Sequence, residues 1–340
     1  MRKILIIRFS SIGDIVLTTP VVRCVKQQVK DVELHVLTKK KYAGLYIGNP
    51  YVDKVHEFDD SVRRVIKELK KEDFDFVADL QRNLRSMKVR CALKCPNATF
   101  NKLDFRKLLY TALKINMLPN VHIVERYFEA VSSIGVKNDG KGLDFFIGDV
   151  NQMSKGDVPE EFRDGFYAVS IGGSYPTKVM PDDMVVKLIK RLGEPVILLG
   201  GYGDMERAAR IVEAVGKNVG NPVGKINLEQ SASIIKMSKA LLTGDTGMMH
   251  IAAALHKPVV SVWGNTVPEF GMYPYMPENQ YLSQIIECKS LKCRPCSKLG
   301  YRQCPKGHFK CMRNLDIDEI ISKLKKILNS RDKCNFCGGR

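Results

Sequence analysis

The stretch Gly244-Asp245-Thr246-Gly247-Met248-Met249-His250 decides the fold of this chain. A short apolar run over residues 239–243 precedes it, and a run of good helix formers over 249–255 follows. A second apolar run covers residues 258–263. This order predicts a strand, a glycine turn, a helix and another strand. Free backbone N–H groups at such a helix start, with the helix dipole behind them, bind anions, so we expect a diphosphate at this turn.

A matching turn lies near the other end of the chain. Residues 3–7 form an apolar run that is typical of a parallel strand buried on both faces. The turn Arg8-Phe9-Ser10-Ser11-Ile12-Gly13-Asp14 follows, and an apolar helical pattern then extends from Ile15 to about Gln28. Two such units in the two halves predict an α/β protein with two doubly wound, Rossmann-like domains facing an interdomain cleft.

The rest of the pattern supports two domains. A stretch richer in Gly, Asp and Pro covers residues 139–159, so we expect one domain over 1–155 and another over 156–340. The second includes a cysteine-rich segment, 288–311, and a closing amphipathic helix, 316–329. Expected strands are 3–8, 32–37, 53–57, 74–79, 196–200, 239–243 and 258–262, and the second half restarts with the run 166–173, in which a strand leads into a glycine turn. Expected helices are 15–28, 61–71, 103–115, 121–134, 182–191, 204–215, 228–236 and 248–255.

The apolar runs and the net charge of the chain limit the classes of protein to which it can belong. No apolar run reaches about 18 residues, so we expect no membrane span, no signal peptide and a cytoplasmic chain. The net charge of +17, from 54 basic and 37 acidic residues, predicts an anionic partner. The basic residues are dispersed rather than gathered with aromatics on one module, which argues against a nucleic-acid partner.

Ten cysteines are present, and five of them lie within residues 288–311. A disulfide framework is not expected in a cytoplasmic chain. Cys293-x-x-Cys296 with Cys304 and Cys311 has the ligand types of a structural Zn²⁺ site, although a second tight pair is missing. We therefore keep a structural zinc open beside ordinary thiols.

Several polar residues follow the expected strands. Asp14 is interpreted either as a helix cap or as a general base for a sugar hydroxyl. Lys178 is either a surface lysine or a group that stabilises a leaving phosphate. After the turn Gly200-Gly201-Tyr202-Gly203, Asp204 or Glu206 is placed to hold ribose hydroxyls, with helix capping by Asp204 as the alternative.

Three segments resemble one known family. Arg8-x-Ser10-Ser11-Ile12-Gly13-Asp14 with Thr19-Pro20 resembles the N-terminal signature of glycosyltransferase family 9. Gly244-Asp245-Thr246-Gly247-x-x-His250 with Gly264-x-Thr266-x-Pro268 resembles its donor-site signature. Asp79-Leu80-Gln81-Arg82-Asn83-x-Arg85-Ser86 resembles its acceptor-side segment. Members of this family are the heptosyltransferases of lipopolysaccharide core assembly, which use ADP-heptose.

The resemblance implies a GT-B fold and an inverting glycosyl transfer that needs no metal or other cofactor. It implies that Asp14 is the general base and that Lys178 contacts the donor phosphate. The implied donor-binding residues are Gly172, Gly173, Ser174, Gly200, Gly201, Asp204, Glu206, Gly244, Asp245, Thr246, Gly247 and His250. The implied acceptor-binding residues are Ser10, Ser11, Gly13, Arg82 and Arg85. One departure concerns Lys178-Val179-Met180-Pro181, where the family commonly has Trp before the proline.

The sequence thus predicts transfer of a heptose or related sugar from ADP-heptose to a lipopolysaccharide inner-core acceptor. The expected partners are a nucleotide sugar, an anionic glycolipid and, peripherally, the cytoplasmic face of the inner membrane. One alternative is a GT-B enzyme that uses another nucleotide sugar for surface-glycan or capsule synthesis. Another is a non-enzymatic binder of anionic polymers with a zinc module.

Overall fold

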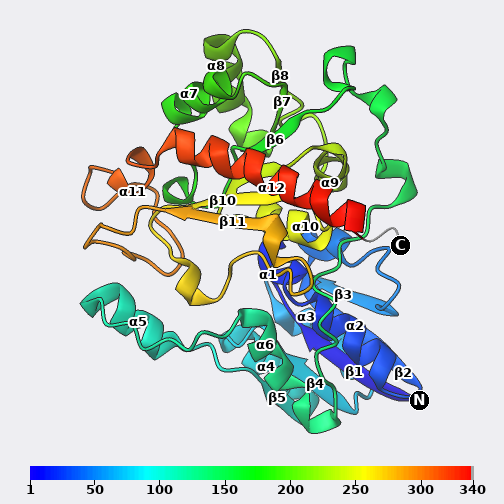
Figure 1. Ribbon diagram of the computed structural model, residues 1–340. Helices are drawn as coiled ribbons and strands as arrows, with labels where there is room; N and C mark the ends of the chain where they lie inside the picture. Colours follow the sequence, from blue (N-terminus) through cyan, green and yellow to red (C-terminus); the bar gives the residue numbers. More distant parts are fainter. Residues whose placement is uncertain (338–340) are drawn as a thin grey trace. The chain divides into compact units, whose positions relative to one another are not determined.

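Two parallel β-sheets organise the structure, a computed structural model that describes residues 1–337 (Figure 1). The strand order is β3-β2-β1-β4-β5 in the first sheet and β11-β10-β9-β6-β7-β8 in the second. All strand pairs in the described part of the chain are parallel. Unit 1 consists of Met1–Asp104 and Pro119–Phe146, and unit 2 consists of Phe105–Leu118 and the chain from Ile147 onward.

Unit 1 is built around β1, because its apolar run is buried on both faces and pairs on both edges. Ile4 lies opposite Leu34 on one side and Phe76 on the other. The strands are β1 Arg2–Ile7, β2 Val32–Lys39, β3 Lys54–Phe58, β4 Phe76–Asp79 and β5 Asn97–Thr99. The helices are α1 Ile12–Val16, α2 Thr19–Gln28, α3 Val62–Leu69, α4 Leu84–Leu93 and α6 Ile123–Tyr127. The apolar side of α3 covers this sheet through Val62, Val65 and Leu69.

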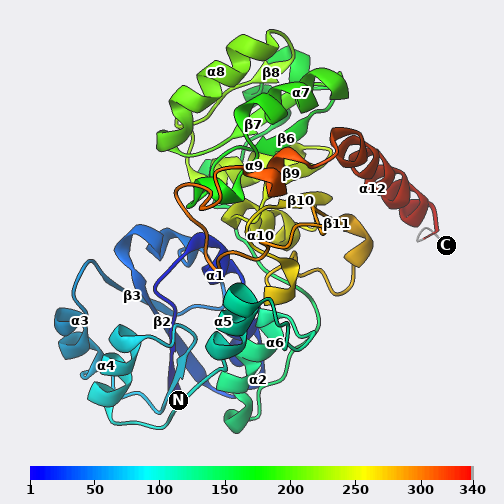
Figure 2. The same cartoon turned by 90° about the vertical axis from the view of Figure 1, so that its left-hand side faces the viewer.

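Unit 2 places helices beside a six-stranded sheet. Its strands are β6 Tyr167–Ser170, β7 Val196–Leu199, β8 Val219–Gly220, β9 Leu241–Gly244, β10 Val259–Trp263 and β11 Ser283–Glu287. The helices are α5 Asp104–Leu113, α7 Asp182–Leu192, α8 Met205–Val215, α9 Leu228–Met237, α10 Gly247–Ala254, α11 Lys310–Arg313 and α12 Ile317–Cys337. Both views show α7 beside α8 and α9 beside α10 (Figures 1 and 2). The start of α12 packs on β10, β11 and α7.

Short 3₁₀ segments connect many of these elements. They are η1 Lys40–Leu45, η2 Phe128–Ala130, η3 Ser132–Ile134, η4 Asp149–Asn151, η5 Lys155–Asp157, η6 Glu160–Phe162, η7 Pro176–Lys178, η8 Tyr202–Asp204, η9 Pro268–Phe270 and η10 Gln280–Leu282. The Lys178 turn is therefore the end of η7 rather than an open loop.

The expected two-domain α/β architecture is confirmed, but several elements differ from the prediction. The helix expected over 15–28 is two helices, because Pro20 lacks an N–H donor and stands in the first turn of α2. The helix expected over 121–134 ends at Tyr127 and continues as 3₁₀ turns. The elements that were not predicted from the sequence are α4, β5, β8, β11 and α11. The described units also divide the chain at Phe146 and assign α5 to the second unit, whereas the sequence placed the boundary at 155.

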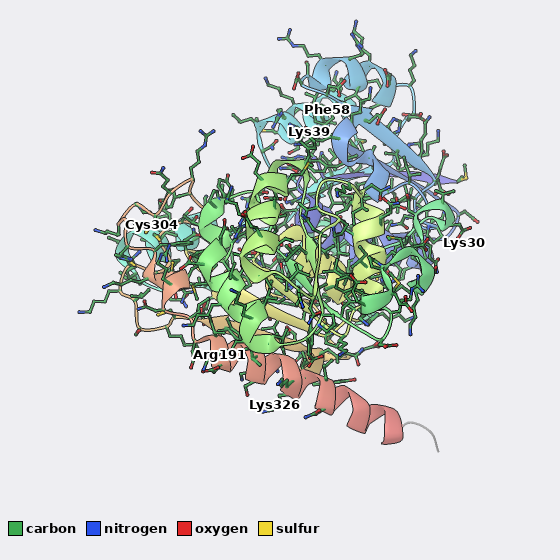
Figure 3. All side chains as sticks on the ribbon, turned by 90° about the horizontal axis from the view of Figure 1, so that it is seen from above. Lys30, Lys39, Phe58, Arg191, Cys304 and Lys326 are labelled. Atoms are coloured by element: carbon green, nitrogen blue, oxygen red, sulfur yellow. The ribbon has the colours of Figure 1, made fainter. Side chains whose placement is uncertain are left out.

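The charge excess is dispersed, as expected. Lys30, Arg191 and Lys326 are exposed and belong to different parts of the chain (Figure 3). Within residues 1–337, no helix combines the length and apolarity needed to cross a membrane.

Candidate functional site

Asp14 lies in the first turn of α1, directly after the turn that leaves β1. Its Oδ1 lies 2.6 Å from Nη2 of Arg8. Its Oδ2 accepts hydrogen bonds from the backbone N–H and the hydroxyl of Ser11, at 3.1 and 2.9 Å. Asp14 therefore does cap α1. It does so from the third position of the helix, as part of a capping box with Ser11, and is not itself the residue that precedes the helix. Its side chain remains 25% exposed, so a carboxylate fixed in orientation is also accessible.

Arg8 is a site residue that sequence reasoning did not select. Its buried guanidinium donates to the carbonyl of Leu80 and, at 3.1 Å, to the hydroxyl of Tyr127. Burial alone would lower the pKa of Arg8, but the Asp14 carboxylate beside it holds that pKa above its usual value. Arg8 thus joins the turn after β1 to the end of β4. The available signals were its position as the first polar residue after the apolar strand and its place at the start of the N-terminal signature.

The acceptor-side segment lies at the carboxyl end of β4, the strand next to β1. Oδ1 of Asp79 accepts the backbone N–H groups of Gln81 and Arg82, at 2.9 and 2.8 Å. The side chain of Gln81 in turn accepts the N–H of Phe9 at 2.9 Å. Parallel strands present their carboxyl ends at one edge, so the structure brings this segment and the Asp14 turn together. Arg82 and Arg85 are exposed there, while Ser10 and Ser11 are half-buried and Gly13 is buried.

The turn over residues 244–247, which the resemblance assigns to the donor, contains a second ion pair. Nζ of Lys178 lies 2.7 Å from Oδ2 of Asp245, and their side chains are only 17% and 10% exposed. The Thr266 hydroxyl donates to the same oxygen at 2.8 Å. The alternative of a solvated surface lysine at position 178 is therefore wrong. The structure brings the Lys178 turn, the Asp245 turn and the segment after β10 to one place.

Glycine is required at this place because backbones approach closely. A Cβ at Gly244 would lie 2.0 Å from the carbonyl oxygen of Lys178. A Cβ at Gly173 would lie 2.8 Å from Cγ1 of Val179 and 3.2 Å from Cγ2 of Thr246. A larger residue at Gly244 would therefore require movement of the backbone, whereas one at Gly173 would require the Val179 and Thr246 side chains to shift. Helix α10 then starts at Gly247, which directs its first N–H groups into this turn.

Asp204 and Glu206 differ clearly in position. Oδ2 of Asp204 accepts the N–H of Gly201 at 2.9 Å. A Cβ at Gly172 would lie 2.4 Å from that same oxygen, so Asp204 stands directly beside the turn after β6. Glu206 is exposed one residue into α8. Ser174 is exposed beside the Lys178 turn, and His250 is buried within α10.

Arg294 braces the donor turn and was also missed by sequence reasoning. Its buried guanidinium donates to the carbonyls of Gly264, at 2.5 Å, and Thr266, at 2.9 Å. It also contacts the Cys288 carbonyl at 2.8 Å and the Glu287 carboxylate at 2.9 Å. The cysteine-rich segment therefore holds Thr266, which binds Asp245. An arginine inside the Cys-Arg-Pro-Cys sequence was the available signal.

The cysteines of that segment are close enough to influence one another. Burial, together with Cys296 and other neighbouring thiols, raises the pKa of Cys311 to about 12. Burial and the Cys293 and Cys304 thiols likewise raise the pKa of Cys296. All four of these residues are free thiols.

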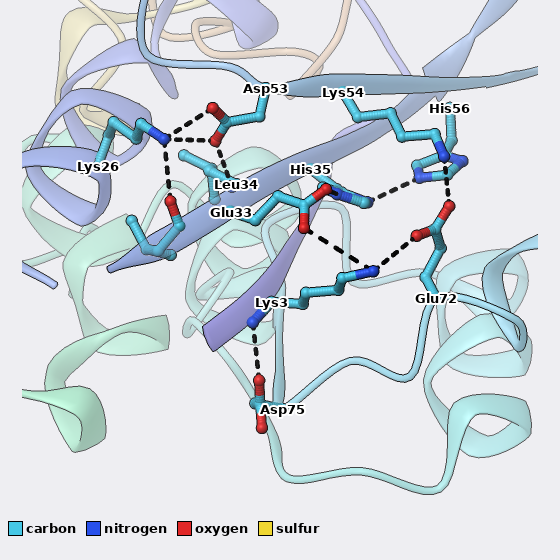
Figure 4. Close-up of polar contacts among 11 residues, drawn as sticks. Lys3, Lys26, Glu33, Leu34, His35, Asp53, Lys54, His56, Glu72 and Asp75 are labelled. Carbon is cyan, nitrogen blue, oxygen red and sulfur yellow. Dashed lines mark hydrogen bonds and ion pairs between the residues drawn. The ribbon is translucent and has the colours of Figure 1, made fainter. Parts of the chain in front are cut away.

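A different group has donor atoms in a closer arrangement. In the described part of the chain, His35, His56 and Glu72 are the three metal-ligating side chains whose donor atoms lie within 4.8 Å of one another. Nδ1 of His35 lies 3.0 Å from Nε2 of His56, and Glu72 binds Lys3 at 3.1 Å and also Lys54 (Figure 4). Because the two lysines already neutralise the nearby carboxylates, we interpret this group as a structural network.

Comparisons with known proteins show what this chain is similar to. A family profile described as glycosyltransferase family 9 (heptosyltransferase) matches residues 62–302. Lipopolysaccharide heptosyltransferase 1 of Campylobacter coli is 26% identical over 289 residues, which cover 78% of this chain and 84% of the relative.

Two solved structures share the fold. The ADP-heptose lipopolysaccharide heptosyltransferase II of E. coli has a TM-score of 0.72 at 18% identity, covering 97% of this chain and 99% of the other. The E. coli heptosyltransferase WaaC, solved with ADP, has a TM-score of 0.66 at 20% identity, covering 96% and 99%. The expected GT-B fold is confirmed by these likenesses.

Proposed function

Since this chain belongs to glycosyltransferase family 9, the heptosyltransferase family, we propose that it transfers a heptose or related sugar from ADP-heptose to a lipopolysaccharide inner-core acceptor. The observation that carries this proposal is the Lys178–Asp245 pair, 2.7 Å apart, at the glycine turn that opens α10. The names of the relatives, which include ADP-heptose and lipopolysaccharide, support the choice of substrates.

On the donor side, the diphosphate would bind at the start of α10. The N–H groups of Thr246 and Gly247 and the helix dipole favour its negative charge. The ammonium of Lys178 would stabilise the additional charge as the nucleoside diphosphate departs, so that no metal is needed. Asp245, held by Lys178 and Thr266, would accept hydrogen bonds from donor sugar hydroxyls.

The ribose of the donor would bind Asp204 rather than Glu206. Asp204 stands beside Gly172 and Gly200 at the ends of β6 and β7, and its side chain occupies the space that a Cβ of either glycine would need. Glu206 is exposed on α8 and contributes no comparable contact to these turns.

On the acceptor side, Asp14 would act as the general base. Its carboxylate would take the proton of the acceptor hydroxyl while that oxygen attacks the anomeric carbon of the donor. The bond from the anomeric carbon to the diphosphate oxygen breaks, ADP leaves with the electron pair, and the anomeric configuration inverts. Arg8 and Ser11 fix the carboxylate without covering it. Arg82 and Arg85, both exposed, would bind phosphates or acidic sugars of the acceptor.

A thermal-shift panel with ADP, UDP, GDP and CMP, each at about 1 mM, tests the donor assignment. A ligand present at about 100 times its Kd stabilises the folded chain by roughly 2.7 kcal/mol, which raises the Tm by several degrees. We expect a shift with ADP alone. A shift with UDP or GDP instead would indicate that the donor is another nucleotide sugar. The absence of a Tm shift with all four nucleotides would contradict the proposed donor site.

A further inference from the structure

Both ends of the loop that carries Lys178 are bound to one side chain. We define the β6–α7 loop as residues 171–180, which follow β6 and end just before α7. Its first and last residues are Ile171 and Met180, and the carbonyls of both accept hydrogen bonds from the guanidinium of Arg207. Nη1 makes the first of these bonds and Nη2 makes the second. Arg207 therefore closes the loop at both ends.

The third donor of Arg207 binds the start of α7. Its Nε lies 2.5 Å from Oδ1 of Asp182, the first residue of that helix. Arg207 is the third residue of α8, and α7 and α8 lie side by side (Figures 1 and 2). Its side chain is only 14% exposed, and Ile171 and Met180 are buried. Buried carbonyls need a donor, and the planar guanidinium supplies donors in fixed directions. These bonds therefore fix both ends of the loop relative to α8.

The same end of α8 also holds the candidate ribose acid. Asp204 directly precedes the helix, and its Oδ2 lies 2.4 Å from the position of a Cβ at Gly172. Further along the loop, Nζ of Lys178 lies 2.7 Å from Oδ2 of Asp245. The start of α8 thus positions Asp204 directly, and it positions Lys178 through Arg207 and the loop.

The middle of the loop has a separate support. The Thr177 hydroxyl donates to the carbonyl of Tyr301 at 3.0 Å and accepts the N–H of the same residue at 2.8 Å. Loss of Arg207 would therefore leave Thr177 attached while both ends of the loop lose their donor. We expect displacement of the neighbouring Lys178 rather than unfolding of the loop.

We propose that Arg207 is a positioning residue for donor binding, which holds the β6–α7 loop so that Lys178 faces the diphosphate. It touches no part of the donor and acts through Lys178. This inference deepens the proposed function and rests on it, because the ligand is the nucleotide part of the proposed donor. The competing explanation is that Arg207 only joins α7 to α8 through Asp182.

Arg210 provides a matched control. It lies one turn further along α8, where its Nη2 is 3.1 Å from the other oxygen of Asp182 and its side chain is 61% exposed. Within the described residues, Arg210 makes no hydrogen bond to the β6–α7 loop. Arg207→Met and Arg210→Met each remove a cation from the same carboxylate, but only Arg207→Met releases the loop.

Calorimetric titration of the full chain with ADP tests the proposal. We expect Arg207→Met to raise the Kd of ADP about tenfold, because a displaced Lys178 contacts the diphosphate poorly, and Arg210→Met to leave this Kd unchanged. In a Lys178→Ala background, Arg207→Met should hardly change the Kd, because the loop no longer carries the group that Arg207 positions. An equal loss of affinity in both backgrounds would overturn the proposal, as would wild-type affinity in Arg207→Met.

Arg207→Lys keeps the proposal testable if Arg207→Met does not fold. Lysine retains the charge that faces Asp182, but it lacks the planar fork that reaches both loop carbonyls. The Kd of ADP should therefore still rise several-fold. Wild-type affinity in Arg207→Lys would overturn the proposal.

Amide hydrogen exchange gives a readout without ligand. The N–H of Lys178 bonds to the carbonyl of Tyr175 at 2.9 Å, and the N–H of Val179 bonds to that of Pro176 at 3.3 Å. Both amides should exchange about tenfold faster in the Arg207 variants than in wild type, and at the wild-type rate in Arg210→Met. Faster exchange in a chain that does not bind ADP would contradict the donor assignment alone. ADP binding with unchanged exchange would contradict the positioning role alone.

Discussion

Lys178 and Asp245 form an ion pair of 2.7 Å at the donor turn, and Thr266 binds the same carboxylate oxygen at 2.8 Å. The pair joins the segment after β6 to the turn after β9, where Gly244 permits close contact of the backbones. The ion pair therefore orients the lysine, which leaves little side-chain freedom to lose when a diphosphate binds.

Lys178→Ala should lower kcat by roughly 10²–10³, because it removes the charge that stabilises the leaving diphosphate. Lys178→Arg, which retains the charge with a different shape, should recover part of that loss. Steady-state kinetics together with ADP titration by calorimetry separates kcat from binding. An alanine variant that turns over as wild type does would show that Lys178 only holds Asp245.

Arg294→Met should destabilise the fold by roughly 3 kcal/mol, because it leaves the buried Glu287 carboxylate with only the exposed Lys289, at 3.9 Å, as an ion-pair partner. The double variant Arg294→Met/Glu287→Met should regain most of that stability. ADP binding should stay weakened in both variants, since the carbonyls of Gly264 and Thr266 lose their donor. Urea unfolding and ADP calorimetry measure the two effects, and full recovery of ADP affinity in the double variant would contradict the bracing role.

Stability should fall as pH decreases from about 6.5 to 4 because of His56. Burial and the neighbouring His35 lower its pKa from 6.5 to about 4, so the unfolded chain binds the proton first. The loss should reach about 2 kcal/mol between pH 7 and pH 5. Hydrogen bonding to Lys54 lowers the pKa of Glu72 to about 2, so its contribution is lost only at lower pH.

The check is urea unfolding at pH 7 and pH 5 for wild type and His56→Gln. The variant should show a much smaller difference between the two pH values. An equal pH dependence in both proteins would assign the effect to other groups.

The four cysteines of this segment stay open between ordinary thiols and one structural Zn²⁺ per chain, which Cys293, Cys296, Cys304 and Cys311 would hold. Zinc would bind the thiolates and release protons that the buried thiols otherwise retain. Metal analysis of wild type should then give stoichiometric zinc, which Cys296→Ser/Cys304→Ser removes and Cys91→Ser, at an exposed position, does not. Purified wild type that folds and binds ADP without metal would refute this assignment.

The two decisive turns could be predicted because their signals are local. An apolar run, a glycine turn and an apolar helix stand together around both Asp14 and Asp245, and the resemblance suggested the chemistry that we propose for them. Very short strands such as β8, with two residues, show too little periodicity to be recognised. The partners of Arg8 and Arg294 could not be predicted, because their contacts join segments that only the tertiary fold brings together.

The contacts of the α5 segment could not be predicted from the sequence either. Its helical pattern was visible, but attachment to unit 2 depends on Phe270 and on the cysteine-rich segment, far away in the sequence. The choice between Asp204 and Glu206 likewise depends on which carboxylate the start of α8 directs toward Gly172.

The most direct test of the account is turnover of ADP-heptose with an inner-core acceptor by wild type and Asp14→Asn. The amide oxygen can still accept the N–H of Ser11, while its NH₂ group replaces the oxygen that faces Arg8. We therefore expect the variant to lose some stability but to fold and to show the wild-type ADP shift. It cannot take the acceptor proton, so its kcat should fall by about 10²–10⁴. Equal rates for the two proteins would contradict Asp14 as the general base.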